Sequence, residues 1–263
     1  MGLVQGATEF LPVSSSGHLT LLPWLLDWPQ PSLVFDTTLH LGTLAAVLIF
    51  FRQDIAQLVI AWWDSGRRRR IDTAEARLAW GILIGTIPAA LAGYLFEDFF
   101  AFFFGSPLWV AIFLLVTGVI LAASERMGRR EHGLEGITWR DALGIGLAQA
   151  VAILPGLSRS GATIGAGLAL GLKREAAARF SFLLSIPIIL GSGAFKLLDV
   201  LEAGGAGASA GGLLLGFLAA ALSGYLCIRF LLAFLQRGRL YGFALYCWGA
   251  GLVTLLLLLF RGG

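Results

Sequence analysis

The chain has 263 residues, of which 57% are hydrophobic and 13% are charged. Soluble domains carry about 25% charged residues, so this composition excludes a soluble enzyme, a secreted disulfide-rich domain and a disordered chain. It indicates an all-α protein that crosses a lipid bilayer several times. The net charge of +3 does not indicate nucleic-acid binding, because the arginines cluster beside hydrophobic segments.

Six hydrophobic segments are long enough to cross the ~30 Å hydrocarbon core of a bilayer as helices. We expect these transmembrane helices at residues 33–52, 76–96, 107–123, 176–200, 212–235 and 241–260. Four shorter apolar segments lie at residues 2–12, 17–28, 141–154 and 160–171. They form two pairs, each interrupted by proline, serine and glycine, and we interpret them as re-entrant half-helices that line a cavity within the protein.

Basic residues in the connections predict the orientation. Arginines at residues 67–70 follow the first predicted span, and the other basic connections fall on the same side of a six-span topology. Because such loops stay cytoplasmic, the first broken pair is expected to enter from the periplasmic or extracellular side and the second from the cytoplasm. This topology favours a site that opens to the periplasmic or extracellular side.

An internal repeat relates the two broken pairs. Residues 2–17 align without gaps on residues 146–161, at a constant offset of 144. The identical pairs are Gly2/Gly146, Leu3/Leu147, Gln5/Gln149, Ser14/Ser158, Ser16/Ser160 and Gly17/Gly161. We therefore expect a single membrane domain, residues 1–263, built of two inverted repeats at about 1–123 and 141–260. Inverted repeats with discontinuous helices place a polar site near the midplane of the membrane.

The first break combines an acidic side chain with a serine-rich turn. Gln5 and Glu9 are four residues apart, so on a helix they share one face. A carboxylate at membrane depth costs at least ~2.5–3.5 kcal/mol, so Glu9 needs a cation, a metal or a polar cavity. The polar residues that follow are Ser14, Ser15, Ser16, Gly17 and His18. Hydroxyls and a glycine at this place cap a new half-helix, whose free amides suit an anion.

The second break adds a positive charge. Arg159 lies between two serines at the start of the next half-helix, and its planar guanidinium suits phosphate oxygens. Ser158, Ser160 and Thr163 supply further hydrogen-bond donors. Together the breaks predict a site for a polyanion and a metal, in which a divalent ion on Glu9 and Gln5 bridges phosphate oxygens. The alternative is structural: the serines act only as helix caps and Arg159 only as the ion-pair partner of Glu9.

These motifs identify a family. The chain resembles the bacterial undecaprenyl-diphosphate phosphatases of the bacitracin-resistance type, over essentially its whole length. That family has a glutamate or glutamine four residues before a glutamate, then P-V-S-S-S/T-G-H, which are found here at residues 5–9 and 12–18. Its second motif, P-G-x-S-R-S-x-x-T, is found at residues 155–163. One departure is Gln5, where many members have glutamate.

The resemblance implies a hydrolase of the bacterial inner membrane that acts on a phosphorus anhydride. Its substrate would be a C55 polyprenyl diphosphate, and its product the monophosphate lipid carrier used in peptidoglycan synthesis. The resemblance also implies dependence on a divalent cation, Mg²⁺ or Ca²⁺. By position, Gln5 and Glu9 would be the metal-associated pair, His18 the acid/base residue, Ser15 the nucleophile or a phosphate ligand, and Arg159 the diphosphate clamp. Ser14, Ser16, Gly17, Ser158, Ser160 and Thr163 would bind the substrate.

Two mechanisms remain open at this stage. In the first, which we favour, His18 activates Ser15, which attacks the terminal phosphorus and forms a phosphoserine that water hydrolyses. In the second, His18 or Glu9 activates a water directly and Ser15 only binds phosphate. In both, Arg159, the metal and the half-helix amides stabilise charge on the phosphoryl oxygens.

Two other functions remain as alternatives. Broken helices in inverted repeats also occur in transporters, so the same anion site could serve a flippase for a polyprenyl phosphate. A flippase has less use for an acid/base pair such as Glu9 and His18. A non-catalytic lipid-binding subunit is the third interpretation, and it predicts that Glu9→Ala leaves function intact. The glycine-rich spans are compatible with a homodimer, because such spans pack equally well within or between chains.

Overall fold

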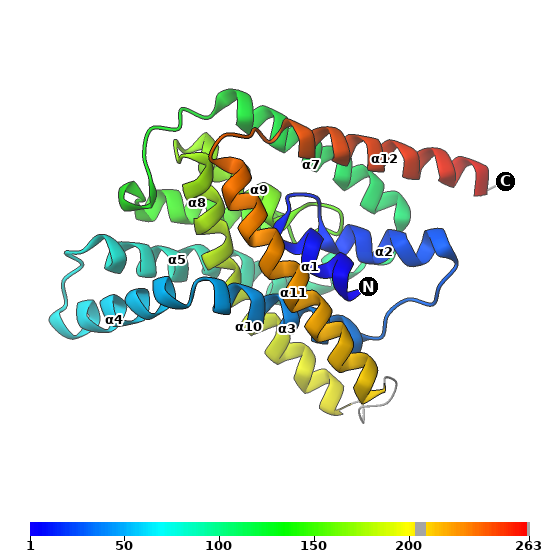
Figure 1. Cartoon of the computed structure of the whole chain (residues 1–263), viewed down its shortest axis with the longest axis horizontal. Helices are drawn as coiled ribbons and strands as arrows, with labels where there is room; N and C mark the ends of the chain where they lie inside the picture. The colour runs from blue at the N-terminus through cyan, green and yellow to red at the C-terminus, as the bar shows by residue number, and fades with distance from the viewer. Residues whose placement is uncertain (203–208, 262–263) are drawn as a thin grey trace.

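The computed structural model describes residues 1–202 and 209–261 of the chain. Within these ranges, six helices are long and apolar enough to span a membrane, and Figure 1 shows how they are arranged. They are α3 (Leu33–Phe50), α5 (Ala74–Leu95), α7 (Pro107–Met127), α10 (Arg174–Glu202), α11 (Ala210–Leu235) and α12 (Tyr241–Arg261). These helices confirm the six predicted spans and the all-α class.

Four shorter helices lie where the interrupted apolar segments were predicted. They are α1 (Gly2–Phe10), α2 (Ser15–Leu26), α8 (Trp139–Val151) and α9 (Arg159–Ala169). Each pair is joined by a short irregular segment that contains the predicted proline and serine residues. That these helices are re-entrant stays a prediction, because it depends on where the bilayer lies.

Helix α4 (Arg52–Arg68) was not predicted. We expected a connection there, but the segment forms a helix that packs along α5, where Trp80 Nε1 donates to Ser65 Oγ at 3.0 Å. Figure 1 shows α4 beside α5. Its charged residues make it too polar to stand out as an apolar segment, although arginines in the last turn favour the helix by facing the negative end of its dipole. Two short helical segments, α6 (Glu97–Ala101) and η1 (Leu134–Gly136), were also missed.

The first helix of each broken pair packs closely against a spanning helix. Helix α1 lies against α11, where a Cβ added at Gly2 would press on the carbonyl oxygen of Gly216. Helix α8 lies against α5, where a Cβ added at Gly146 would press on the carbonyl oxygen of Gly85. Gly2 and Gly146 are repeat-related positions, so both need glycine for the same reason. The inverted repeat itself stays a prediction.

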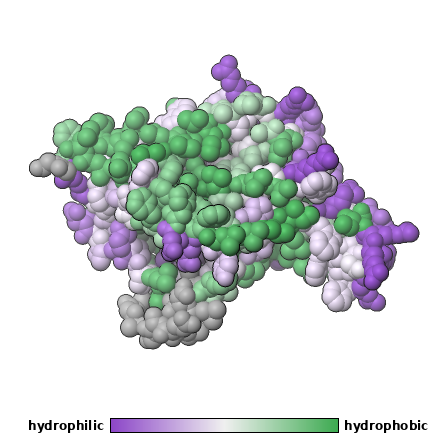
Figure 2. All heavy atoms as spheres, turned by 180° about the vertical axis from the view of Figure 1, so that it is seen from behind, coloured by the Kyte–Doolittle hydropathy of each residue, from purple (hydrophilic) through white to green (hydrophobic). Residues whose placement is uncertain are grey.

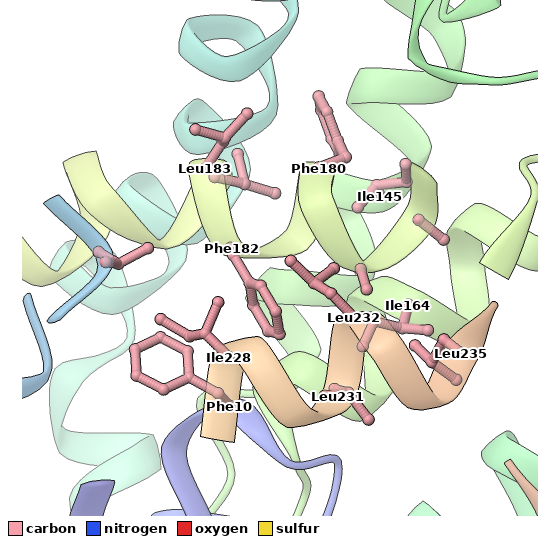
Figure 3. Close-up of a cluster of buried hydrophobic side chains, with 14 of the residues drawn as sticks. Phe10, Ile145, Ile164, Phe180, Phe182, Leu183, Ile228, Leu231, Leu232 and Leu235 are labelled. Carbon is pink, nitrogen blue, oxygen red and sulfur yellow. The ribbon is translucent and has the colours of Figure 1, made fainter. Parts of the chain in front are cut away.

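The hydrophobic core holds the two broken pairs together. Figure 3 shows Phe10 of α1 near Phe182 of α10 and Ile228 of α11. The rings of Phe10 and Phe182 pack edge to face, with their centroids 5.3 Å apart. Ile164 of α9 belongs to the same core cluster. Because Phe10 follows Glu9 directly and Ile164 lies one turn after Ser160, this core sets the position of both breaks.

The outer surface suits a lipid environment. Figure 2 shows hydrophobic side chains across the middle of one face and hydrophilic side chains mostly toward its edges. On α11, Leu215 and Leu222 are more than half exposed. Large exposed apolar areas mark contact with a membrane or a partner, so this surface agrees with a multi-pass membrane protein.

Candidate active site

The two breaks lie side by side. Arg159 Nη2 donates to Glu9 Oε1 at 2.8 Å, and Ser160 Oγ donates to the carbonyl oxygen of Leu11 at 3.1 Å. The chain backbones also approach each other, since a Cβ added at Gly17 would lie 3.3 Å from Gly156 Cα. The polar residues of both motifs therefore form one site, although about 150 residues separate them.

Each break starts its second helix with a serine cap. Ser14 Oγ accepts from the amide of Gly17 at 3.3 Å, and Ser158 Oγ accepts from the amide of Gly161 at 3.0 Å. Both bonds satisfy one of the open amides at a helix N-terminus. The hydroxyl oxygen of each capping serine also lies close to that of the serine two residues later. The distance is 3.3 Å from Ser14 to Ser16 and 3.2 Å from Ser158 to Ser160. The local geometry thus repeats at the offset found in the sequence.

The two caps differ in backbone conformation. Ser14 has a φ of 71°, whereas Ser158 has a φ of −69°. A non-glycine residue at positive φ is strained, and such residues cluster at functional sites. The strained turn of the first break is the one that presents Ser15, which begins α2.

Glu9 is the centre of the hydrogen-bond network. Its side chain is 7% exposed, and Oε1 accepts the bond from Arg159. Oε2 accepts from Ser15 Oγ at 2.6 Å and from Gln5 Nε2 at 3.1 Å. A buried carboxylate needs a paired charge and further hydrogen bonds, and these three side chains supply them.

The Glu9–Ser15 contact differs from the pairing that we expected. The sequence suggested that His18 activates Ser15, but both ring nitrogens of His18 are bonded elsewhere. Nδ1 lies 2.7 Å from the carbonyl oxygen of Ser14, and Nε2 lies 2.6 Å from the hydroxyl oxygen of Tyr246 in α12. Side chains on a helix point back toward its N-terminus, which brings His18 to the carbonyl four residues earlier.

Arg159 is held on a second side by α10. Its Nη1 donates to the carbonyl oxygen of Ser181 at 3.2 Å. The hydroxyls of Ser181 and Thr163 share a hydrogen bond of 2.6 Å, which ties α9 to α10. The guanidinium therefore has a fixed orientation, with contacts to Glu9 and to α10 at the same time.

The predicted substrate-binding residues of the second motif are deeply buried. Ser158, Ser160 and Thr163 are each at most 1% exposed, and their hydroxyls are bonded within the protein. In this state they support the break rather than face an open space. The Arg159 side chain, in the same motif, is more accessible than these three, with an exposed fraction of 15%.

The structure adds Ser181 and Tyr246 to the residues found by sequence. Both lie in predicted transmembrane spans, and neither belongs to a motif of the two breaks. The sequence of an apolar helix does not indicate which residue its serine or tyrosine will contact. Ser181 and Tyr246 could therefore be identified only from the packing of α10 and α12 on the breaks.

Gln5 provides the observation that bears on a metal ion. Its Oε1 is buried and has no hydrogen-bond partner in the part of the chain that the structure describes. This oxygen and the Glu9 carboxylate belong to side chains joined by a hydrogen bond. Among the described residues, no group of three or more His, Cys, Asp or Glu is placed to hold a metal. The donor set fits a hard cation that takes one or two protein oxygens and completes its shell with phosphate and water.

Comparisons with known proteins cover nearly the whole chain. Residues 1–253 match the family model described as "Bacitracin resistance protein BacA". An undecaprenyl-diphosphatase of Thermomicrobium roseum is 46% identical over 268 residues, covering 99% of this chain and 96% of that protein. The undecaprenyl-diphosphatase of Rubrobacter xylanophilus is 49% identical, covering 98% of this chain and 97% of that protein. Undecaprenyl-diphosphatase 2 of Stutzerimonas stutzeri is 46% identical, covering 100% of this chain and 97% of that protein.

Proposed function

The chain belongs to the bacitracin resistance protein BacA family, and on this premise we propose that it is an undecaprenyl-diphosphatase of the bacterial cell wall pathway. It hydrolyses C55 polyprenyl diphosphate to the monophosphate carrier lipid and inorganic phosphate. The full-length similarity to proteins of that name supports the activity. The observation that carries the site is the contact of Ser15 Oγ with Glu9 Oε2 beside the guanidinium of Arg159.

Ser15 is the proposed nucleophile. A serine hydroxyl needs a neighbouring base, and Glu9 Oε2 accepts its hydrogen bond at 2.6 Å. Ser15 Oγ attacks the terminal phosphorus as its proton moves to Glu9. The bond from phosphorus to the bridging oxygen breaks, so polyprenyl monophosphate leaves and a phosphoserine remains. Water then hydrolyses the phosphoserine and releases inorganic phosphate.

Arg159 and the start of α2 stabilise the negative charge of the reacting phosphate. The guanidinium can offer its fork to two phosphoryl oxygens, and it is already fixed by Glu9 and by Ser181. Ser15 is the first residue of α2, and helix N-termini favour anions. Donors that are fixed before the reaction stabilise the transition state without reorganising.

His18 is the proposed acid/base residue for the leaving oxygen or for the hydrolytic water. Its Nδ1 is bonded to the carbonyl of Ser14, so Nε2 is the atom that exchanges a proton. This role differs from the activation of Ser15 that the sequence suggested, because Glu9 lies at that hydroxyl. Direct attack by water, with Ser15 as a phosphate ligand, is the alternative that the experiment below tests.

A divalent cation, Mg²⁺ or Ca²⁺, fits beside Gln5 and Glu9. Gln5 Oε1 has no hydrogen-bond partner within the described ranges, and the amide nitrogen of the same side chain donates to the Glu9 carboxylate. When bound, the cation would neutralise charge on the diphosphate. Gln5 contributes an amide oxygen, which adds no charge, so Glu9 and the substrate supply the negative ligands.

The setting is the bacterial inner membrane, with the polyprenyl tail in the bilayer. Arginines at residues 67–70 favour a cytoplasmic position for the end of α4, so the site opens to the periplasmic side. Labelling of single cysteines placed at Asp98 and at Arg69 with an impermeant thiol reagent would test this orientation in intact spheroplasts. Labelling at Asp98 and protection at Arg69 is the expected result.

The test of this function is phosphate release from a long-chain polyprenyl diphosphate by purified protein, with and without a chelator. Ser15→Ala, Glu9→Ala and Arg159→Ala should each abolish release, and Ser192→Ala on the exposed face of α10 should not. Acid quenching followed by mass spectrometry should find phosphate on Ser15. A fully active Ser15→Ala variant would contradict the nucleophile, and folded wild-type protein that binds the lipid without releasing phosphate would favour the flippase.

A further inference from the structure

His18 is connected to helix α12. The Nε2 atom of His18 and the hydroxyl oxygen of Tyr246 are 2.6 Å apart. The planes of the two rings are also nearly parallel, with an angle of 11° between them and centroids 5.7 Å apart. A short hydrogen bond from an adjacent, nearly parallel ring fixes both the position and the plane of the imidazole.

The partners of His18 determine which nitrogen carries the proton. A backbone carbonyl can only accept, so the 2.7 Å contact with Ser14 requires a proton on Nδ1. In the neutral ring, Nε2 is then an acceptor, and the Tyr246 hydroxyl donates to it. The tautomer of a histidine is set in this way by the bonds of its two nitrogens.

The same bonds reach the strained turn that presents Ser15. His18 Nδ1–H holds the carbonyl of Ser14, whose φ of 71° is unfavourable for serine. The residue after Tyr246 contacts the same break, because Cys247 Sγ lies 3.6 Å from the carbonyl oxygen of Pro12. Helix α12 therefore supports the first break at two adjacent residues.

We propose that Tyr246 is a positioning residue that acts through His18. Its hydroxyl and ring hold the imidazole as the Nδ1–H tautomer, with Nε2 as the proton-accepting atom. Through the bond from His18 to Ser14, it also steadies the turn that carries the nucleophile. This inference rests on the proposed role of His18 in the phosphatase reaction.

The first test measures the coupling between the two residues. Tyr246→Phe keeps the ring and removes the hydroxyl, and it should lower kcat about 3- to 10-fold, as expected for one hydrogen bond, with KM nearly unchanged. His18→Asn should lower kcat about 10²- to 10⁴-fold. If Tyr246 acts through His18, the double variant is no slower than His18→Asn alone. Tyr241→Phe, the same substitution at the start of α12, is the matched control and should leave kcat unchanged.

The second test observes the ring directly. The chain has three histidines, so the side-chain nitrogens of histidine-labelled protein can be resolved by NMR in detergent or nanodiscs. His18→Gln identifies the signals of His18. Wild-type protein should show a protonated Nδ1 and a hydrogen-bonded, unprotonated Nε2 at this residue. Tyr246→Phe should shift the Nε2 signal and leave those of His40 and His132 in place.

The outcomes separate this inference from the proposed function. Losses of kcat that multiply in the double variant, or a His18 signal that is identical in Tyr246→Phe, would overturn the role of Tyr246. An active Ser15→Ala variant would overturn the nucleophile instead, whatever Tyr246 does. A rise in KM without a fall in kcat would assign Tyr246 to substrate binding and also contradict the proposal.

Discussion

Arg159 and Glu9 form an ion pair of 2.8 Å across the two breaks, although they belong to different halves of the chain. Such a pair is also what we would expect if Arg159 served only as the structural ion-pair partner of Glu9. It does not stand alone, however, because the other oxygen of Glu9 accepts the hydroxyl of Ser15. A pair that served only for stability would not need a hydroxyl from a strained turn.

Arg159→Lys should lower kcat/KM by about 10²-fold, because lysine has a single ammonium group where arginine has a planar fork. The lysine ammonium cannot contact both Glu9 and the carbonyl of Ser181, as Arg159 does, and still face a phosphate. Steady-state phosphate release measures the effect. The control is Arg126→Lys on an exposed face of α7, and an Arg159→Lys variant as active as this control would contradict the clamp.

Gln5→Glu should lower the concentration of Mg²⁺ or Ca²⁺ needed for half-maximal activity, because a second carboxylate adds charge to the cation site. A chelator should reduce the activity of the wild-type protein, and added cation should restore it. The measurement is a cation titration of phosphate release. Gln57→Glu on the exposed face of α4 adds the same charge elsewhere, and equal titrations for the two variants would remove Gln5 from the site.

Glu125→Ala should lower the free energy of unfolding by about 1–3 kcal/mol, because two partly exposed arginines and a backbone amide lose their carboxylate partner. The Glu125 side chain is 1% exposed and binds Arg174 and Arg130, and it also accepts from the amide of Leu240 just before α12. Thermal unfolding in detergent measures the loss. Glu135→Ala, at an exposed carboxylate nearby, should leave the unfolding midpoint nearly unchanged. A Glu125→Ala variant as stable as this control would contradict the role of the cluster.

Gly146→Ala should destabilise the protein by about 1–3 kcal/mol, because overpacking forces neighbouring groups apart. The added methyl group would press on the backbone of Gly85 in α5, which cannot rotate away. Gly66→Ala is the matched control, since a Cβ there meets nothing within 4 Å. In that helix the substitution should stabilise by about 0.5–1 kcal/mol, and equal unfolding midpoints for the two variants would contradict the close contact of α8 and α5.

The spans and the two breaks could be predicted from sequence because they depend on local features. A helix that crosses a bilayer needs a long apolar run, and a broken helix needs proline and a cap such as Ser14 or Ser158. Helix α4 could not be found in this way, since its stability comes from packing on α5 through contacts such as Trp80 with Ser65. Hydropathy carries no information about such contacts.

The residues of the candidate site were found more readily than their pairing. Glu9, Ser15, His18 and Arg159 stand in motifs, so a linear pattern identifies them. Which of them share a hydrogen bond depends on rotamers and on how α2 leaves the strained turn at Ser14. For this reason the sequence joined His18 to Ser15, whereas the structure joins Glu9 to Ser15.

Helix α12 also holds the far end of α2. Arg261 Nη1 donates to the carbonyl oxygen of Trp24 at 2.6 Å, and Nη2 donates to that of Leu25 at 3.1 Å. These are carbonyls at the C-terminal end of α2, which lack partners within the helix and favour a cation. Because 237 residues separate Trp24 from Arg261, ribosomal synthesis supplies this support of α2 only after the spans α3, α5, α7, α10 and α11 have been made. Helix α2 is therefore synthesised early but held at its far end late.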